Sequence, residues 1–130
     1  MLLNLTDLSD EPLQSQIVRQ VRAKVLAGEL GSGDGLPSIR ALARDQHISV
    51  ITVQRAYESL EREGLIHSRR GKGFFVSELS GDDKESMARG RLENGLGPHI
   101  RSALAEGLSK EAVRDIVQRI LSKNGNNQDA

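Results

Sequence analysis

A regular pattern of apolar positions extends over residues 11–27. Apolar side chains recur there at every fourth position and therefore share one face of a helix. They are Leu13, Ile17, Val21 and Val25. Asp10 is placed to cap the first turn, and Gly28 can end the helix in the left-handed conformation. The pattern predicts a helix over residues 11–27, with Arg22 on the side that faces water.

Two shorter helical patterns follow a glycine-rich loop. Ser38 is placed to cap a helix reaching about residue 45, and Ser49 to cap a second one over residues 49–62. In the second helix the apolar positions share one side, whereas Ile51 and Arg55 point nearly opposite. The apolar positions are Val53, Ala56, Tyr57 and Leu60. The sequence therefore predicts a pair of closely spaced helices, the second of which presents Arg55 outward.

Two strand-like runs, residues 65–69 and 74–77, follow the helix pair. They are joined by Arg70-Gly71-Lys72-Gly73, which is typical of a hairpin with a basic tip. Two closely spaced helices and a basic hairpin form the element order of a winged helix-turn-helix. Such modules place the second helix of the pair in the major groove of DNA.

Leucine and isoleucine recur at intervals of four over residues 92–108. Because two glycines and Pro98 interrupt this run, it predicts two helices or one sharply kinked helix, over about residues 82–94 and 98–107. Ser109 is placed to cap a final helix that reaches about Lys123.

The predicted tail helices carry a continuous apolar face. This face either packs on the preceding domain or forms a dimer interface. Because a small module has little surface left to cover it, we expect a second copy of the chain to bury it. The residues expected in that interface are Leu92, Leu96, Ile100, Leu104, Val113, Ile116, Val117 and Ile120.

These elements predict a mostly helical α+β fold in three parts. Residues 1–78 form a winged helix-turn-helix DNA-binding domain, and residues 79–123 form a helical dimerisation tail. The polar residues 124–130 are expected to be a disordered C-terminus.

Composition excludes several classes of site. The chain has no cysteine, which rules out disulfides and thiolate zinc sites. His47, His67 and His99 are far apart and lack clustered carboxylates, so we expect neither a metal site nor a cofactor. Aromatic residues make up only 2%, too few for the stacking platforms of a single-strand binder. With no export signal and no apolar run of about 18 residues, we expect a cytoplasmic protein without a membrane partner.

Charge is unevenly distributed in a chain whose formal net charge is zero. Residues 36–76 hold seven basic and four acidic groups, and both flanking segments are net acidic. A positive excess on the helix pair and hairpin favours contact with phosphates. An excess of this size also fits an ordinary solvated surface.

Four blocks of this basic segment resemble the DNA-binding domain of GntR-family bacterial regulators. They are LPSIRALA at residues 36–43, TVQRAY at 52–57, LEREGLI at 60–66 and GKGFFV at 71–76. The short helical tail is similar to that of the YtrA subfamily. The resemblance implies a homodimeric transcription repressor that binds a double-stranded DNA operator.

The resemblance places DNA contacts at the start of the helix pair, on the outer face of its second helix and at the hairpin tip. Guanidinium and ammonium groups there suit phosphate oxygens. Arg55 also matches guanine, Gln54 adenine and Ile51 a thymine methyl group. Ile51 is explained equally well as a plain surface residue, and the oblique projection of Gln54 favours the surface interpretation for that residue. The full predicted set is Ser38, Arg40, Ser49, Val50, Ile51, Thr52, Gln54, Arg55, Arg69, Arg70, Gly71 and Lys72.

Two other classes of function are alternatives to DNA binding. A winged helix can serve as a protein–protein interaction module, for which DNA binding would be absent or insensitive to salt. An enzyme is disfavoured, because the chain lacks clustered catalytic groups and a phosphate-cradling glycine motif. A small-molecule effector could bind between the tail helices, but no convergent polar residues identify one.

Overall fold

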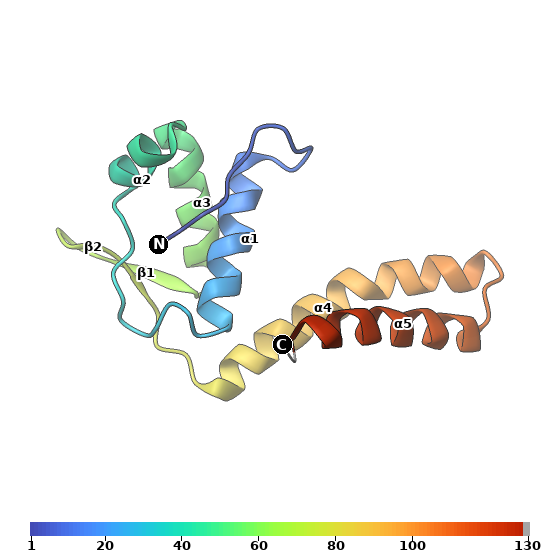
Figure 1. The fold of residues 1–130 in the computed structure, drawn as a ribbon. Helices are drawn as coiled ribbons and strands as arrows, with labels where there is room; N and C mark the ends of the chain where they lie inside the picture. The colour runs from blue at the N-terminus through green and yellow to red at the C-terminus, as the bar shows by residue number, and fades with distance from the viewer. Residues whose placement is uncertain (129–130) are drawn as a thin grey trace. The chain divides into compact units, whose positions relative to one another are not determined.

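The computed structural model describes residues 1–128, and their side chains as far as residue 124. The chain forms two compact units, Met1–Glu85 and Ser86–Ala130 (Figure 1). The first contains three helices, a two-stranded antiparallel sheet and the start of a fourth helix, which continues into the second unit. The predicted α+β fold, a winged helix-turn-helix followed by C-terminal helices, is confirmed.

Helix α1 spans Leu13–Leu26 and buries the predicted apolar face. The expected cap by Asp10 is wrong. Pro12 occupies the N-cap position and no side chain caps the helix, because the chain turns into the helix two residues after Asp10. At the other end Gly28 adopts the predicted left-handed conformation, with φ of 84°.

Helices α2 (Ile39–Gln46) and α3 (Val50–Arg62) form the helix-turn-helix. The predicted caps are both present: Ser38 Oγ accepts a hydrogen bond from the Ala41 amide at 3.1 Å, and Ser49 Oγ accepts one from the Thr52 amide at 3.0 Å. Between the helices His47 has a φ of 55°, the left-handed conformation that lets the chain reverse within a short turn.

The core of this unit is aliphatic and lies between α1, α3 and the sheet. Val53, Tyr57 and Leu60 on α3 are fully buried against α1, whose inner face is equally inaccessible. Arg22 of α1 does not face water as expected. Its side chain is 14% exposed, and its guanidinium makes two hydrogen bonds to the Glu63 carboxylate at 2.8 and 3.0 Å, so this charge links α1 to the end of α3.

Strands β1 (Ile66–Arg69) and β2 (Gly73–Val76) form the wing, an antiparallel hairpin in which Ser68 pairs with Phe74. The glycine-rich loop before α2 lies along the far side of β2. Its Leu36 amide donates to the Phe74 carbonyl at 2.9 Å, and the Val76 amide donates to the Asp34 carbonyl at 2.8 Å. This third pairing segment was not predicted.

An N-terminal arm, residues 1–6, lies beside α1 and leads into a bent segment, residues 7–11. Gln20 makes two hydrogen bonds to the backbone of Asn4, both 2.8 Å, and Gln16 brackets the backbone of Thr6 at 2.7 and 2.9 Å. Leu3, only 7% exposed, anchors the arm in the core. The two glutamine side chains therefore satisfy backbone groups of this segment that a neighbouring strand would satisfy in a sheet.

Helix α4 spans Gly81–Ala105 as one element, with Pro98 inside it. The alternative of two separate helices is thus wrong. Pro98 and Asn94 are both exposed, so the Asn94 carbonyl that loses its usual donor can bond water instead.

Helix α5 spans Lys110–Gln128 and is capped as predicted, with Ser109 Oγ accepting from the Ala112 amide at 3.1 Å. It runs five residues past the expected end at Lys123, so the helix includes residues 124–128 of the segment predicted to be disordered. Residues 129 and 130 lie outside the described residues.

Candidate nucleic-acid interface

The structure brings most of the predicted contact residues onto the helix-turn-helix and the wing of the first unit. Every one of the twelve is exposed except Thr52, which is half-buried. Ser38 and Ser49 are committed to the caps described above, and Thr52 Oγ1 lies 3.2 Å from Ser49 Oγ. These hydroxyls therefore stabilise the first turns of α2 and α3, and their contact with DNA remains a prediction.

The outer face of α3 mixes exposed aliphatic and polar side chains. Val50 is 45% and Ile51 58% exposed, and Arg55 projects from the same face. Gln54 Nε2 donates to Glu58 Oε1 at 3.2 Å, which occupies one of its two N–H donors. The surface thus offers apolar contact and hydrogen-bonding groups side by side, as base edges in a major groove require.

The wing tip owes its shape to two glycines. Gly71 and Gly73 have φ of 75° and 100°, conformations that L side chains rarely adopt. The Lys72 amide closes the turn on the Arg69 carbonyl at 2.9 Å. The Arg69 guanidinium carbon lies 5.0 Å from the centroid of the Phe75 ring, so this cation rests on the hairpin, whereas Arg70 and Lys72 stand at its tip.

Ion pairing differs between the two sides of this unit. On α1, Arg19, Arg22 and Lys24 pair with carboxylates. Over residues 1–124, no carboxylate lies within salt-bridge distance of a second set of cations, on α2, α3 and the wing tip. They are Arg40, Arg55, Arg70 and Lys72. These four cations of the surface expected to meet DNA therefore have no carboxylate partner, whereas Arg44 of α2 pairs with Asp45 at 3.4 Å.

Two side chains that sequence reasoning did not assign to the site hold its parts together. The Tyr57 hydroxyl donates to the Pro37 carbonyl at 2.8 Å, just before α2, and its ring meets Phe74 of the wing edge-on at 5.0 Å. Glu61 Oε2 accepts hydrogen bonds from the Ser68 amide and hydroxyl at 3.3 and 3.1 Å. Tyr57 was read from its spacing as a core residue only, and Glu61 resembles any exposed helix carboxylate.

The second unit has an incomplete core. Over its described side chains no residue is buried, and many apolar residues of α4, of α5 and of the turn between them are more than a third exposed. They are Leu92, Leu96, Leu104, Leu108, Ile116, Ile120 and Leu121. An apolar cavity of about 150 Å³ lies between the two helices, lined by Ile100, Val113 and Val117 among others. Six of the eight predicted interface residues line this cavity, and Leu92 and Leu104 do not.

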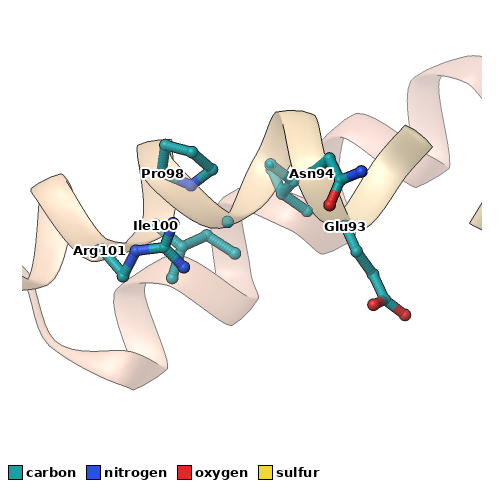
Figure 2. Close-up of a pocket in the computed structure, with 7 residues that line it drawn as sticks. Glu93, Asn94, Pro98, Ile100 and Arg101 are labelled. Carbon is teal, nitrogen blue, oxygen red and sulfur yellow. The ribbon is translucent and has the colours of Figure 1, made fainter. Parts of the chain in front are cut away.

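A second hollow, of about 500 Å³, follows α4 around Pro98 (Figure 2). The Arg101 side chain lies close to Gly97 on the same helix. A Cβ atom added at Gly97 would approach the Arg101 guanidinium to 3.1 Å. Glu93 and Arg101 stand at opposite ends of the hollow, eight residues or roughly 12 Å apart along a helix. Its polar groups therefore do not converge on one point, and they identify no effector.

The described part of the chain contains no group of three His, Cys, Asp or Glu side chains able to hold a metal ion. Among its helices, none combines the length and the apolarity needed to cross a membrane.

Comparison with known proteins identifies the fold's relatives. The family model for bacterial regulatory proteins of the gntR family matches residues 13–76. The HTH-type transcriptional repressor YtrA of Bacillus subtilis is 35% identical over 70% of this chain and 68% of its own length. The uncharacterised HTH-type regulator YhcF of the same organism is 33% identical over 81% of this chain and 86% of its own.

A solved structure has a similar fold. A GntR family transcriptional regulator from Listeria monocytogenes superposes with a TM-score of 0.71 at 27% identity, covering 85% of this chain and 96% of that one. Residues 13–76, which the family model matches, contain the helix-turn-helix and the wing. The matches to YtrA and YhcF, over 91 and 108 residues, extend beyond that segment. The chain therefore belongs to the GntR family of bacterial DNA-binding regulators, with the YtrA type among its relatives.

Proposed function

We propose that the protein is a homodimeric repressor that binds a double-stranded DNA operator, with α3 in the major groove and the wing tip on a neighbouring groove. One observation carries the proposal. Arg40, Arg55, Arg70 and Lys72 lie on the three elements that would face DNA and have no carboxylate partner among residues 1–124. Such cations can contact phosphates without first breaking an ion pair.

The three elements are suited to different kinds of contact with DNA. Arg40 in the first turn of α2 and the cations of the wing tip suit phosphate oxygens, which set the position of the protein on the duplex. Arg55 and its exposed neighbours on α3 suit base edges, which carry sequence information. The related protein YtrA is named a transcriptional repressor, which supports repression rather than activation. Membership of this family makes the protein a regulator rather than an enzyme.

A second copy of the chain is proposed to cover the apolar face of the tail. The α4–α5 hairpin buries none of its described side chains alone, yet exposes leucine and isoleucine along both helices. A monomer would leave this surface in water, and a symmetric partner would remove it. A dimer would also present two copies of α3 to two half-sites of one operator. We place this regulator in the cytoplasm, where the bacterial chromosome lies.

Salt dependence of DNA binding tests the proposal. Affinity for duplex DNA, measured by fluorescence anisotropy at several salt concentrations, should fall steeply as salt rises. The log–log slope should be about −0.9 for each phosphate neutralised. Replacing both Arg70 and Lys72 with Ala should make the slope shallower by about two. A matched control replaces Lys24 of α1, which is paired with Glu29, by Ala and should leave the slope unchanged.

Two outcomes would contradict the proposal. Affinity that stays flat from low to physiological salt would remove its electrostatic basis. No binding to duplex DNA at low salt, from a folded protein, would favour the protein–protein interaction module instead.

A further inference from the structure

The strand that leads into the wing tip is tied to the recognition helix by one carboxylate. Glu61 lies in the last turn of α3, and its Oε2 accepts hydrogen bonds from Ser68 N at 3.3 Å and from Ser68 Oγ at 3.1 Å. Ser68 lies in β1 directly before Arg69, the residue that enters the turn. The contact therefore holds the strand at the point where it enters the turn that carries Arg70 and Lys72.

The geometry of the hairpin explains why an acceptor is needed there. The Ser77 amide donates to the Leu65 carbonyl at 3.0 Å, and hydrogen-bonded positions alternate along an antiparallel pair. Ser68, opposite Phe74, is therefore a non-bonded position whose amide points to the free edge of the hairpin. On the other edge, Phe74 accepts from Leu36. The wing is thus held on one side by the loop before α2 and on the other by Glu61.

We propose that Glu61 is a positioning residue for DNA binding, which fixes the wing relative to α3 so that both engage one duplex together. The inference rests on the proposed DNA-binding function. Glu61 need not touch DNA for this role. Its contribution is to keep Arg70 and Lys72 in the place where they can reach phosphates while α3 occupies the groove, which reduces the ordering cost of binding.

Charge alone predicts the opposite effect. Glu61 is an exposed carboxylate next to a surface proposed to bind a polyanion, and such a charge opposes association. Removing it should strengthen DNA binding if electrostatics were its only influence. A loss of affinity on removal therefore identifies the positioning role by the sign of the change.

The test measures duplex-DNA binding across salt for four new variants of the full-length protein and for the Arg70 and Lys72 double variant described above. Glu61→Ala should bind about fivefold more weakly than the wild type, the equivalent of one charge-assisted hydrogen bond at an exposed site. Glu61→Gln keeps an oxygen that can accept from Ser68 and removes the charge, so it should bind at least as well as the wild type. Glu58→Ala is the matched control: Glu58 lies one turn earlier and accepts from Gln54 of its own helix. It should bind equally well or more tightly.

The fourth variant combines Glu61→Ala with replacement of Arg70 and Lys72 by Ala. A wing that is already misplaced has less binding to lose, so the two tip substitutions should reduce affinity less in the Glu61→Ala background than in the wild type. Thermal unfolding of each variant checks that the fold persists. Should Glu61→Ala fail to fold, Ser68→Ala removes the 3.1 Å bond alone and should give a smaller loss of affinity.

The outcomes separate the two proposals. Wild-type protein that binds no duplex DNA refutes the proposed function itself. The positioning role alone is overturned if the wild type binds DNA, Glu61→Ala behaves like Glu58→Ala, and the tip substitutions act equally in both backgrounds.

Discussion

Replacing Tyr57 with Phe should destabilise the first unit and change its response to alkaline pH. Tyr57 is the only tyrosine of the chain, and it is fully buried. Its hydroxyl donates to the Pro37 carbonyl at 2.8 Å, while its ring packs edge-on against Phe74 at 5.0 Å. Phenylalanine preserves the ring contact and removes only the hydrogen bond.

The magnitude follows from that single bond. A buried neutral hydrogen bond whose acceptor is left behind contributes about 1–1.5 kcal/mol to the free energy of unfolding. In a domain of this size, 1 kcal/mol lowers the melting temperature by roughly 4–8 °C. Tyr57→Leu also removes the aromatic contact, and should cost about 0.5–1.5 kcal/mol more. Circular dichroism at a fixed protein concentration measures both changes.

The pH dependence has a definite sign. Burial raises the pKa of Tyr57, so the folded state keeps its hydroxyl protonated where an unfolded tyrosine ionises. The stabilisation is fully present below the ordinary tyrosine pKa of about 10, and falls above it by up to ~1.4 kcal/mol per pH unit. The wild type should therefore lose stability at alkaline pH through this group, and the Phe variant should lack that component.

The single tyrosine also supplies the assay. Ultraviolet absorbance of tyrosinate reports Tyr57 alone, and should appear only as the protein unfolds. The reasoning would be refuted if tyrosinate formed near pH 10 in protein that remains folded. It would fail equally if wild type and Tyr57→Phe had the same stability at neutral pH and declined in parallel at higher pH.

Three further substitutions test other parts of the structure. Gln16→Leu, which removes the bonds to the N-terminal arm from a 2%-exposed position, should lower the unfolding free energy by about 2 kcal/mol in urea denaturation, and the same change at half-buried Gln20 should cost less. Arg55→Ala should weaken operator binding by ~1–3 kcal/mol and relax one base preference in operator selection; an unchanged consensus would instead make Arg55 a phosphate contact. Ile116→Lys should release monomers in sedimentation, whereas Gln118→Lys should not, and a wild type that is monomeric at micromolar concentration would contradict the proposed interface.

Periodicity and capping residues predicted most of the first unit. Ser38 and Ser49 cap their helices as expected, because a hydroxyl before an apolar run has a local role that needs no distant partner. The inner face of α3 was predicted for a related reason. A spacing of three and four residues can be read without knowing what the helix packs against.

The features that were missed depend on contacts between distant segments. Gln16 and Gln20 looked like polar positions on a helix, and only the arm beside them makes them ligands of backbone groups. The loop at residues 33–36 lacks the alternation of a strand, so its pairing with β2 left no sequence signal. Pro98 was expected either to divide this run into two helices or to kink one helix sharply, and exposure of the affected carbonyl allows a single helix to continue.

The same division explains why the fold can be assigned more securely than the operator. On α3, Val53 and Tyr57 are fully buried, so core packing fixes the inner face of the helix and restricts which residues can occupy it. Ile51 and Arg55 on the outer face contribute little to that packing, and their replacement should alter DNA recognition while the fold survives. Positions free to change without loss of stability are the ones through which related regulators can acquire different operators. The buried inner face therefore determines the winged helix-turn-helix, whereas the exposed side chains of the outer face determine base preference.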